Sequence, residues 1–372
     1  MTRTQNKTRF LVFLLCLAVS DFVVAQSHPV EMSYEAGIDH YNFLRDKLGG
    51  YDVFFDGESH NVASNEVRHF NLFRFLNSNF GVRYYIKEYD FQYGYSVNKY
   101  LQTGDEAWFG RGPSKEAVEF YRKLYELNRT LPEGEKITFI SLDAYAFRDT
   151  EEFLARMTHG KGSAPSVVDE VLTVLKGIKK TDTRGMGMDV RGKDKAEIMS
   201  ALKEVRKKVV AGESHFREYF GDDYVFFYLM VFNHASEKRT DENLLQNFLE
   251  FKRLVGGSKY YFHYGNLHCQ LKGGWLASKL NDVEGFRGKV CSFTAQYRDS
   301  EYYWPYEIRK ETNFGIVNSG SYSTSAIDKL LSIPYDCSIT AATEIGGGLD
   351  KGTTYVYFLR DQKAMNSNHQ KP

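Results

Sequence analysis

The residues best suited to chemistry stand at the end of a short apolar run near the start of the chain. The run Asp52–Glu58 ends in a glycine and an acid, and His60 follows two residues after Glu58. On extended backbone, residues two apart point to the same side, so this carboxylate and this imidazole can meet. Such a pair suits activation of water, and it also suits metal binding. The alternative is that Glu58 and His60 only cap the helix expected to follow.

Ionisable side chains also close three later apolar runs. They are Glu88 and Asp90 after Val82–Ile86, Asp143 after Ile137–Leu142, and His263, Asn266 and His268 at the end of Lys259–Asn266. Parallel strands present their carboxyl ends along one edge of a sheet, where open α/β folds bind their ligands. We therefore expect one pocket that contains several carboxylates and two or three histidines.

These residue types predict hydrolysis of a carbonyl compound. In this hypothesis His60 takes a proton from water, and Glu58 and Glu88 orient the imidazole and tune its pKa. His268 and Arg68, the latter near the start of the first long helix, would stabilise the oxyanion. The expected substrate-binding side chains are Asp90, Asp143, His263 and Asn266.

Several of these residues have simpler interpretations. Glu88 and Asp90 can pair with Lys87 at the surface. His263 alternates with Tyr261 and can face the core, so His268 is preferred as the late histidine of the site. His69, which follows Arg68, is expected at the surface.

A second copy of the tetrapeptide Gly57–His60 occurs at Gly212–His215. A lysine-rich helical segment precedes this copy in place of a strand, so we expect its side chains on a helix surface. The tetrapeptide therefore carries meaning only with the strand in front of it.

The elements needed to position the site can be read from short apolar runs bounded by glycine or polar residues. The predicted strands are Asp52–Glu58, Val82–Asp90, Lys136–Asp143, Lys259–Asn266, Lys289–Tyr297, Cys337–Thr343 and Thr353–Leu359. Helical patterns at Ser64–Asn79, Ser96–Leu101 and Ser114–Asn128 separate the first of them. This alternation predicts an α/β fold with a largely parallel central sheet flanked by helices, and the last two strands form an antiparallel edge.

The region from about residue 151 to 255 has few strand signals. Its predicted helices are Glu151–Met157, Ala164–Lys179, Lys193–Tyr219 and Glu242–Leu254, with a glycine-containing loop at Thr181–Lys195. We interpret 151–255 as a helical insertion or lid over the carboxyl ends of the strands. Residues 26–150 and 256–372 then form the two parts of the α/β domain.

The N-terminus has the pattern of a secretory signal. Basic residues precede the apolar stretch Phe10–Ser20, which is too short to span a bilayer, and Val23-Val24-Ala25 offers a cleavage site. We expect a mature chain that starts after residue 25, contains no integral membrane segment and is secreted or periplasmic. The 48 basic and 48 acidic residues give no strong field for nucleic acid, so a small-molecule substrate is the expected partner.

Three cysteines follow the signal segment, Cys269, Cys291 and Cys337. This odd and sparse set is not a disulfide framework, although one bridge can form between two of them. The spacing does not predict a zinc site, and the leading hypothesis has no cofactor. A divalent metal remains an alternative at the histidine and carboxylate cluster.

The order of these motifs resembles the erythromycin-esterase superfamily over about residues 50 to 270. The matching segments are Gly57–His60, Arg68 to Leu76, Glu88–Asp90, Tyr100 to Gly104, Asp143, Arg239–Asp241 and Gly265–His268. The resemblance implies an α/β fold with its site at the strand tips and, in the esterases, metal-independent hydrolysis. It places the family's glutamate and base histidine on Glu58 and His60, its arginine near Arg68, its second glutamate on Glu88 and its late histidine on His268.

The chain departs from the macrolide esterases at two points. Only Ser59 separates the glutamate from the histidine, where those enzymes typically have two residues, and Gly265 stands where they tend to have a histidine. The shorter spacing is similar to that of the haem-binding ChaN-like lipoproteins and the TIKI-type proteases of the wider superfamily.

The leading hypothesis is an exported hydrolase of an ester, lactone or amide. The alternatives on the same fold are a protein that binds iron, haem or an organic ligand, and a metal-dependent protease. A further alternative is an inactive site on a protein that binds a protein partner.

Overall fold

A computed structural model describes eleven segments of the chain. They are residues 29–33, 37–109, 113–143, 150–177, 195–234, 240–303, 308–315, 328–329, 332–334, 337–346 and 352–365. The predicted signal segment, the loop from Thr181 to residue 194, and Arg239 lie outside them.

One mostly parallel sheet forms the centre of the protein. Its strands are β1 (Val30–Glu31), β2 (Val53–Glu58), β3 (Tyr84–Asp90), β4 (Thr138–Asp143), β5 (Tyr260–Gly265), β6 (Val290–Tyr303), β7 (Ile308–Gly315), β8 (Cys337–Ala341) and β9 (Tyr355–Arg360). Their order is β1-β8-β9-β6-β2-β5-β3-β4, and β7 pairs with β6 outside this path. The strands from β9 to β4 run parallel, whereas β1, β7 and β8 are antiparallel to their neighbours.

This sheet confirms the predicted fold class. All seven predicted strands are present, and β8 and β9 form the expected antiparallel pair. The prediction missed β1 and β7, which follow no clear alternating pattern. β5 returns after the helical region and inserts between β2 and β3, so strands distant in sequence become neighbours at the centre.

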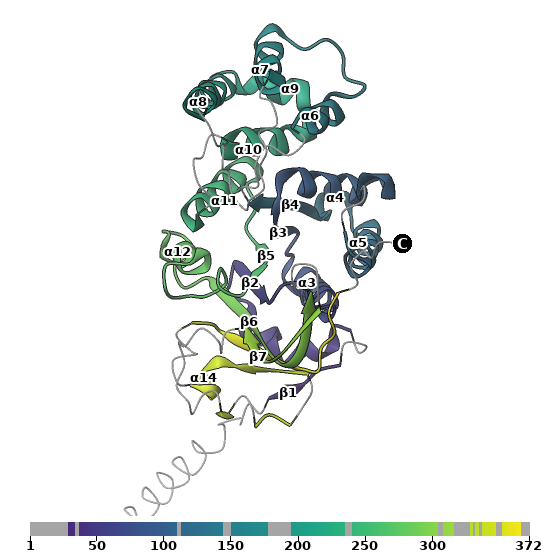
Figure 1. Cartoon of the computed structure of the whole chain (residues 1–372), viewed down its shortest axis with the longest axis vertical. Coiled ribbons are helices and arrows are strands. Elements are labelled where there is room, and N and C mark those ends of the chain that lie inside the picture. The colour runs from purple at the N-terminus through teal and green to yellow at the C-terminus, as the bar shows by residue number, and fades with distance from the viewer. Residues whose placement is uncertain are drawn as a thin grey trace, which may run out of the picture.

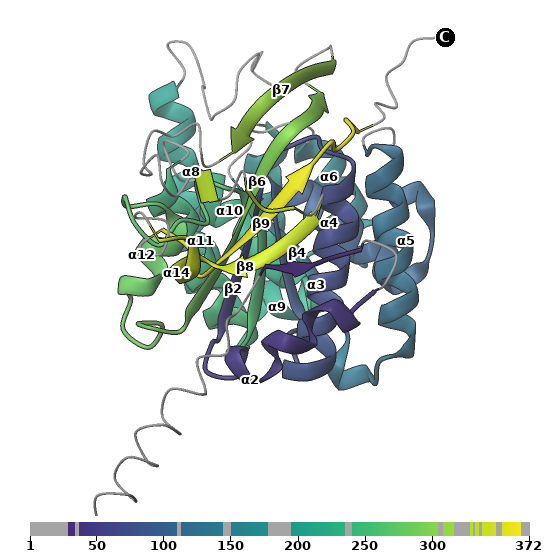
Figure 2. The ribbon, with the colours of Figure 1, turned by 90° about the horizontal axis from the view of Figure 1, so that it is seen from below.

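Helices cover both faces of the sheet. On one side lie α2 (Arg45–Leu48), α3 (Ser64–Phe80) and α5 (Lys115–Thr130), and on the other lie α11 (Asp241–Val255) and α12 (Leu276–Asp282), as Figure 2 shows. Within β2, Phe54 packs into the first layer and Phe55 into the second, because successive side chains alternate across a strand. A sheet buried on both faces explains why its strands are apolar along most of their length.

The region between β4 and β5 is helical, as predicted. It contains α6 (Thr150–Thr158), α7 (Ser166–Gly177), α8 (Lys195–Ala211), α9 (Glu213–Phe220), α10 (Tyr224–His234) and α11. Helices α6 to α9 stack beyond α10 at the end of the molecule away from β1, whereas α11 packs against the sheet (Figure 1). The prediction missed α10 and α12, and it joined α8 and α9 across Gly212. The division of the chain into domains stays a prediction.

Helix α4 (Phe91–Thr103) starts directly at the end of β3, and the short helix α14 (Ala342–Ile345) follows β8. Its N-cap is Asp90, whose side chain accepts a hydrogen bond of 2.7 Å from the backbone N–H of Tyr93. In the part of the chain that the structure describes, no helix combines the length and apolar character needed to cross a membrane.

Candidate active site

The carboxyl ends of β2, β5 and β3 meet at the centre of the sheet. Glu58 pairs in register with Gly265, and Lys87 pairs with His263. Further out, Asp90 pairs with Asp143 of β4. The topology therefore places all four predicted clusters along one edge.

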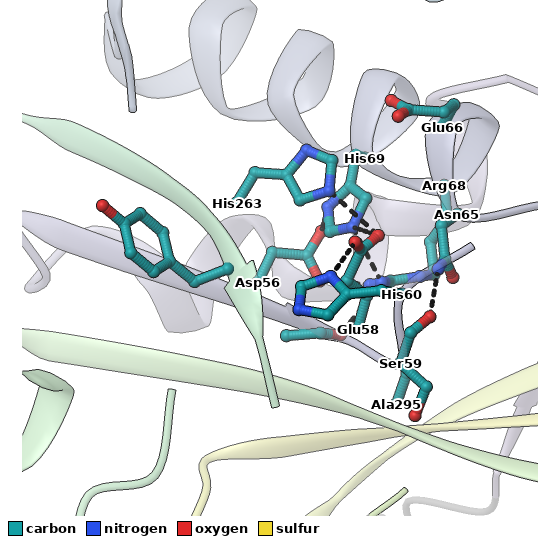
Figure 3. Close-up of polar contacts among 12 residues, drawn as sticks. Asp56, Glu58, Ser59, His60, Asn65, Glu66, Arg68, His69, His263 and Ala295 are labelled. Carbon is teal, nitrogen blue, oxygen red and sulfur yellow. Dashed lines mark hydrogen bonds and ion pairs between the residues drawn. The ribbon is translucent and has the colours of Figure 1, made fainter. Parts of the chain in front are cut away.

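Glu58 is the centre of the site, because three imidazoles direct a ring nitrogen at its carboxylate (Figure 3). Oε1 lies 2.9 Å from Nδ1 of His60, and Oε2 lies 2.9 Å from Nε2 of His263 and 3.1 Å from Nε2 of His69. These histidines come from the loop after β2, from β5 and from α3. One carboxylate thus joins three elements that are far apart in the sequence.

A second layer of buried groups supports these imidazoles. Asp56 forms an ion pair with Arg68, and its Oδ2 lies 2.8 Å from Nδ1 of His69. The hydroxyl of Tyr261 donates to the same Oδ2 at 2.6 Å, and the hydroxyl of Tyr85 lies 2.7 Å from Nδ1 of His263. Asp56 and Glu58 therefore share one face of β2 with His69 above them.

Two histidines face Glu88 from opposite sides at the edge of this network. Oε2 of Glu88 lies 3.7 Å from Nε2 of His60 and accepts a 2.6 Å hydrogen bond from the N–H of Gly265. Its Oε1 lies 3.5 Å from Nε2 of His268, and Nδ1 of His268 lies 2.9 Å from Oδ1 of Asp241. Asp241 is the first residue of α11, so the helical region contributes directly to the site.

Gly265 lies where His60 and Glu88 approach each other. A Cβ at this position would lie 3.0 Å from Nε2 of His60 and 3.3 Å from Oε2 of Glu88. Any other residue here would make these two side chains shift by a few tenths of an ångström.

The charges of the network set the pKa values of its members. Burial favours neutral Glu58, but the contacts with His263, His60 and His69 outweigh burial and hold the pKa of Glu58 well below its usual range. Burial also opposes ionisation of Asp56, yet Arg68 and His69 lower the pKa of Asp56 to about 2.

His60 and His263 respond to this environment in opposite ways. Burial tends to lower the pKa of His60, but the hydrogen bond to Glu58 and the charge of Glu88 raise it to about 9. Burial, together with the positive charge of His69, holds the pKa of His263 well below its usual range. The His60 side chain is 47% exposed, so water can reach it, whereas His263 is 1% exposed.

The donor set of Glu58, His69 and His263 matches the ligands of many metal sites, but its geometry does not. Their ligand atoms lie within 4.8 Å of one another. However, the two rings are stacked, with centroids 3.4 Å apart and planes 24° apart. A metal lies in the plane of each imidazole at about 2.0–2.1 Å from its nitrogen, and two nearly parallel planes at this spacing share no such point. As arranged here, the three residues fit a hydrogen-bond network and not a metal.

The structure separates the predicted site residues into two groups. Glu58, His60, Glu88, His263 and His268 lie together. Their catalytic and binding roles stay predictions.

The other predicted site residues have structural contacts, and their roles in binding or catalysis also stay predictions. Asp90 caps α4, and the Asn266 side chain donates to the carbonyl of Ala295 at 2.7 Å. Arg68 is 1% exposed and paired with Asp56, while Asp143 is fully buried at the end of β4.

Two surface predictions were wrong. His69 is fully buried, because it lies on the stripe of α3 that packs against the sheet with Asn65, Leu72 and Phe73. Lys87 is also buried, and its Nζ lies 2.8 Å from Oε1 of Glu66 rather than beside Glu88 or Asp90 at the surface. By contrast, the second tetrapeptide copy lies at the start of α9 with His215 exposed, as predicted.

Sequence reasoning missed Asp56, His69, Tyr85 and Tyr261 as members of the site. Alternation along β2 gave a signal for Asp56, since it shares a face with Glu58. Helical spacing gave a signal for His69, which lies four residues after Asn65 and four before Phe73. The tyrosines resemble any other aromatic core residue.

The cysteines do not contribute to this chemistry. Cys269, Cys291 and Cys337 are buried free thiols, so the possible disulfide among them is not formed. Burial raises the pKa of Cys269 well above its usual value, which disfavours a thiolate nucleophile beside His268.

Comparisons with known proteins identify the fold. No family model matches the sequence, and no curated protein matches it. Three solved structures share the fold over at least 90% of this chain and 96% of theirs. They are a succinoglycan biosynthesis protein (14% identity, TM-score 0.62), a Bacillus cereus protein (10%, 0.67) and a mutant of the erythromycin esterase EreC in its open conformation (11%, 0.62). The resemblance predicted from the motif order is thus confirmed at the level of the fold.

The buried charges of this site predict a large effect of Asp56→Asn on stability. This change leaves Arg68 and His69 without their buried partner, so we expect the free energy of unfolding in urea to fall by about 3–5 kcal/mol. Asp52→Asn is the matched control, because Asp52 forms a partly exposed pair with Lys289 before the same strand. We expect a loss of about 0–1 kcal/mol for the control. Equal losses for the two variants would contradict the assignment of Asp56 as a buried ion-pair partner.

Proposed function

We propose that the protein is an exported hydrolase that attacks an ester, lactone or amide carbonyl with water activated by His60. One observation carries this proposal. Glu58 holds Nδ1 of His60 at 2.9 Å, while the opposite nitrogen faces Glu88 from a ring that is 47% exposed. A carboxylate-oriented imidazole whose second nitrogen can be reached by water is the arrangement required of a general base. The fold shared with an erythromycin esterase supports a hydrolase.

The reaction assigns separate tasks to the two histidines. Neutral His60 accepts a proton at Nε2 as the water oxygen bonds to the carbonyl carbon, and Glu58 stabilises the imidazolium that forms. In this scheme Nε2 of His268, which lies 3.5 Å from Oε1 of Glu88, donates a hydrogen bond to the developing oxyanion. The tetrahedral intermediate then collapses, and His60 returns the proton to the leaving oxygen or nitrogen.

Arg68 acts through its neighbours in this scheme. It is buried against Asp56, and its Nη2 donates to the carbonyl of Gly57 at 3.0 Å. It therefore holds the β2 tip in place and does not contact the substrate.

Export rests on the N-terminal pattern of basic residues, apolar stretch and cleavage site. When the full-length chain is expressed in a secreting host, the exported protein should begin at Gln26. The intact mass of the purified exported protein measures this. A secreted or periplasmic chain that still begins at Met1 would contradict this part of the proposal.

Removal of the base should abolish most activity. We expect His60→Ala to lower kcat/KM by about 100- to 10,000-fold in screens of p-nitrophenyl esters, lactones and peptide amides. The matched control is His215→Ala, which alters the same residue of the repeated tetrapeptide at an exposed position on α9. Full activity of His60→Ala, or equal losses in both variants, would contradict the proposed role of His60.

The pH dependence follows from the raised pKa of His60. A general base works when it is deprotonated, so kcat/KM should rise about tenfold per pH unit below about 9 and level off above. Glu88→Gln removes a negative charge that raises this pKa, so the rising limb should move to lower pH. A rate that instead falls above pH 9 would show that the protonated imidazole is the active form, against this mechanism.

A further inference from the structure

The stacked imidazoles of His69 and His263 form an unusual pair beneath the site. Both rings direct Nε2 at the same oxygen of Glu58, and both are almost fully buried. They come from α3 and β5, and Figure 3 shows them on the same side of Glu58. Their hydrogen-bond partners determine which ring carries a charge.

His69 lies between two carboxylates. Nδ1 is 2.8 Å from Oδ2 of Asp56, and Nε2 is 3.1 Å from Oε2 of Glu58. The hydroxyl of Tyr261 also lies 2.9 Å from Nδ1. An ionised carboxylate only accepts hydrogen bonds, so a hydrogen on each ring nitrogen of His69 satisfies both carboxylates. A ring with two such hydrogens is an imidazolium.

His263 has the partners of a neutral ring. Its Nε2 donates to Glu58, and its Nδ1 accepts from the hydroxyl of Tyr85 at 2.7 Å. Two positive rings stacked at 3.4 Å would repel each other, whereas one positive and one neutral ring do not. The low pKa of His263 agrees with this division.

A positive His69 balances the charges of its three buried charged partners. Asp56 and Glu58 bring two negative charges, and Arg68 brings one positive charge. The competing arrangement has a neutral His69 that accepts from Nη2 of Arg68 at 3.1 Å. Nη2 has a second N–H besides the one bonded to the Gly57 carbonyl, so it can reach His69. In that arrangement, however, the bare Nε2 of His69 would face Oε2 of ionised Glu58 at 3.1 Å, and two acceptors that face each other repel.

We propose that His69 is a buried imidazolium that positions Glu58 for its contact with His60. With His263 it fixes Oε2 of Glu58 and keeps the carboxylate ionised, which directs Oε1 at His60. His69 is thus a positioning residue, because it touches neither the substrate nor the reacting water. The catalytic part of this inference rests on the proposed function.

Side-chain ¹⁵N NMR of the wild-type protein tests the charge state without any substrate. The histidine nitrogens are assigned through bonds, so the measurement needs no variant that fails to fold. At neutral pH we expect two protonated, imidazolium-type nitrogens for His69. His263 should show one protonated and one bare nitrogen under the same conditions. A bare nitrogen in His69 at neutral pH would overturn the proposal.

A kinetic comparison tests the positioning role. His69→Gln keeps a donor group but removes the charge, so kcat should fall at least tenfold at the pH plateau while KM stays within about twofold. The control is His40→Gln, which changes a partly exposed histidine in the 3-10 helix Asp39–Leu44. This variant should leave kcat and KM unchanged. Unchanged kcat in a folded His69→Gln variant would overturn the positioning role. Absence of hydrolysis in the wild type, with the expected ¹⁵N pattern, would instead remove the proposed function and leave the buried imidazolium standing.

Discussion

The site depends on one carboxylate that binds three imidazoles. Glu58 ends β2 and is contacted by histidines from a loop, a helix and a strand. The most distant of them, His263, lies 205 residues from Glu58 in the sequence. An almost buried carboxylate is unstable unless it is fully hydrogen-bonded and its charge is compensated. Arg68 and His69 of α3 supply the compensating charge for Glu58 and Asp56. The burial of these carboxylates therefore depends on the packing of α3 against the sheet. His60, the exposed member of the network, is oriented by Glu58, which together with Glu88 raises its pKa.

A second tie joins the helical region to the strand tips. Asp241 at the start of α11 contacts His268 through Oδ1 and accepts the backbone N–H of Leu276 at 2.6 Å through Oδ2. The same region also contacts the sheet where Asn247 donates to the carbonyl of Leu142 at 2.9 Å. The helices between β4 and β5 thus contribute to the candidate site, since α11 contacts one of the two histidines that face Glu88. Tyr89 and Leu267 remain exposed beside Glu88 and His268, which leaves apolar surface at the edge of the site.

Most of the sheet could be predicted from sequence, because buried parallel strands are short apolar runs with clear ends. The same runs located Glu58, Glu88 and His268, since each follows a strand. His69 was misplaced because a histidine beside an arginine on a polar-looking helix suggests solvent, and only pairing with Asp56 and Glu58 makes its burial favourable. Asp90 and Asn266 were assigned to the pocket, but the start of α4 and the backbone of β6 use their polar atoms first. The insertion of β5 between β2 and β3, on which the site depends, has no local signal in the sequence.

The likeness to solved structures extends over the whole fold at 10 to 14% identity, so the chemistry must be judged from this chain's own residues. The central claim is that Glu58 is an ionised acceptor of three imidazole hydrogens. A neutron structure at neutral pH tests it most directly, because it locates each hydrogen. The account predicts hydrogen on Nδ1 of His60 and on Nε2 of both His69 and His263, and none on the Glu58 carboxylate. A hydrogen on that carboxylate, or a bare nitrogen facing it from any of the three rings, would contradict the account.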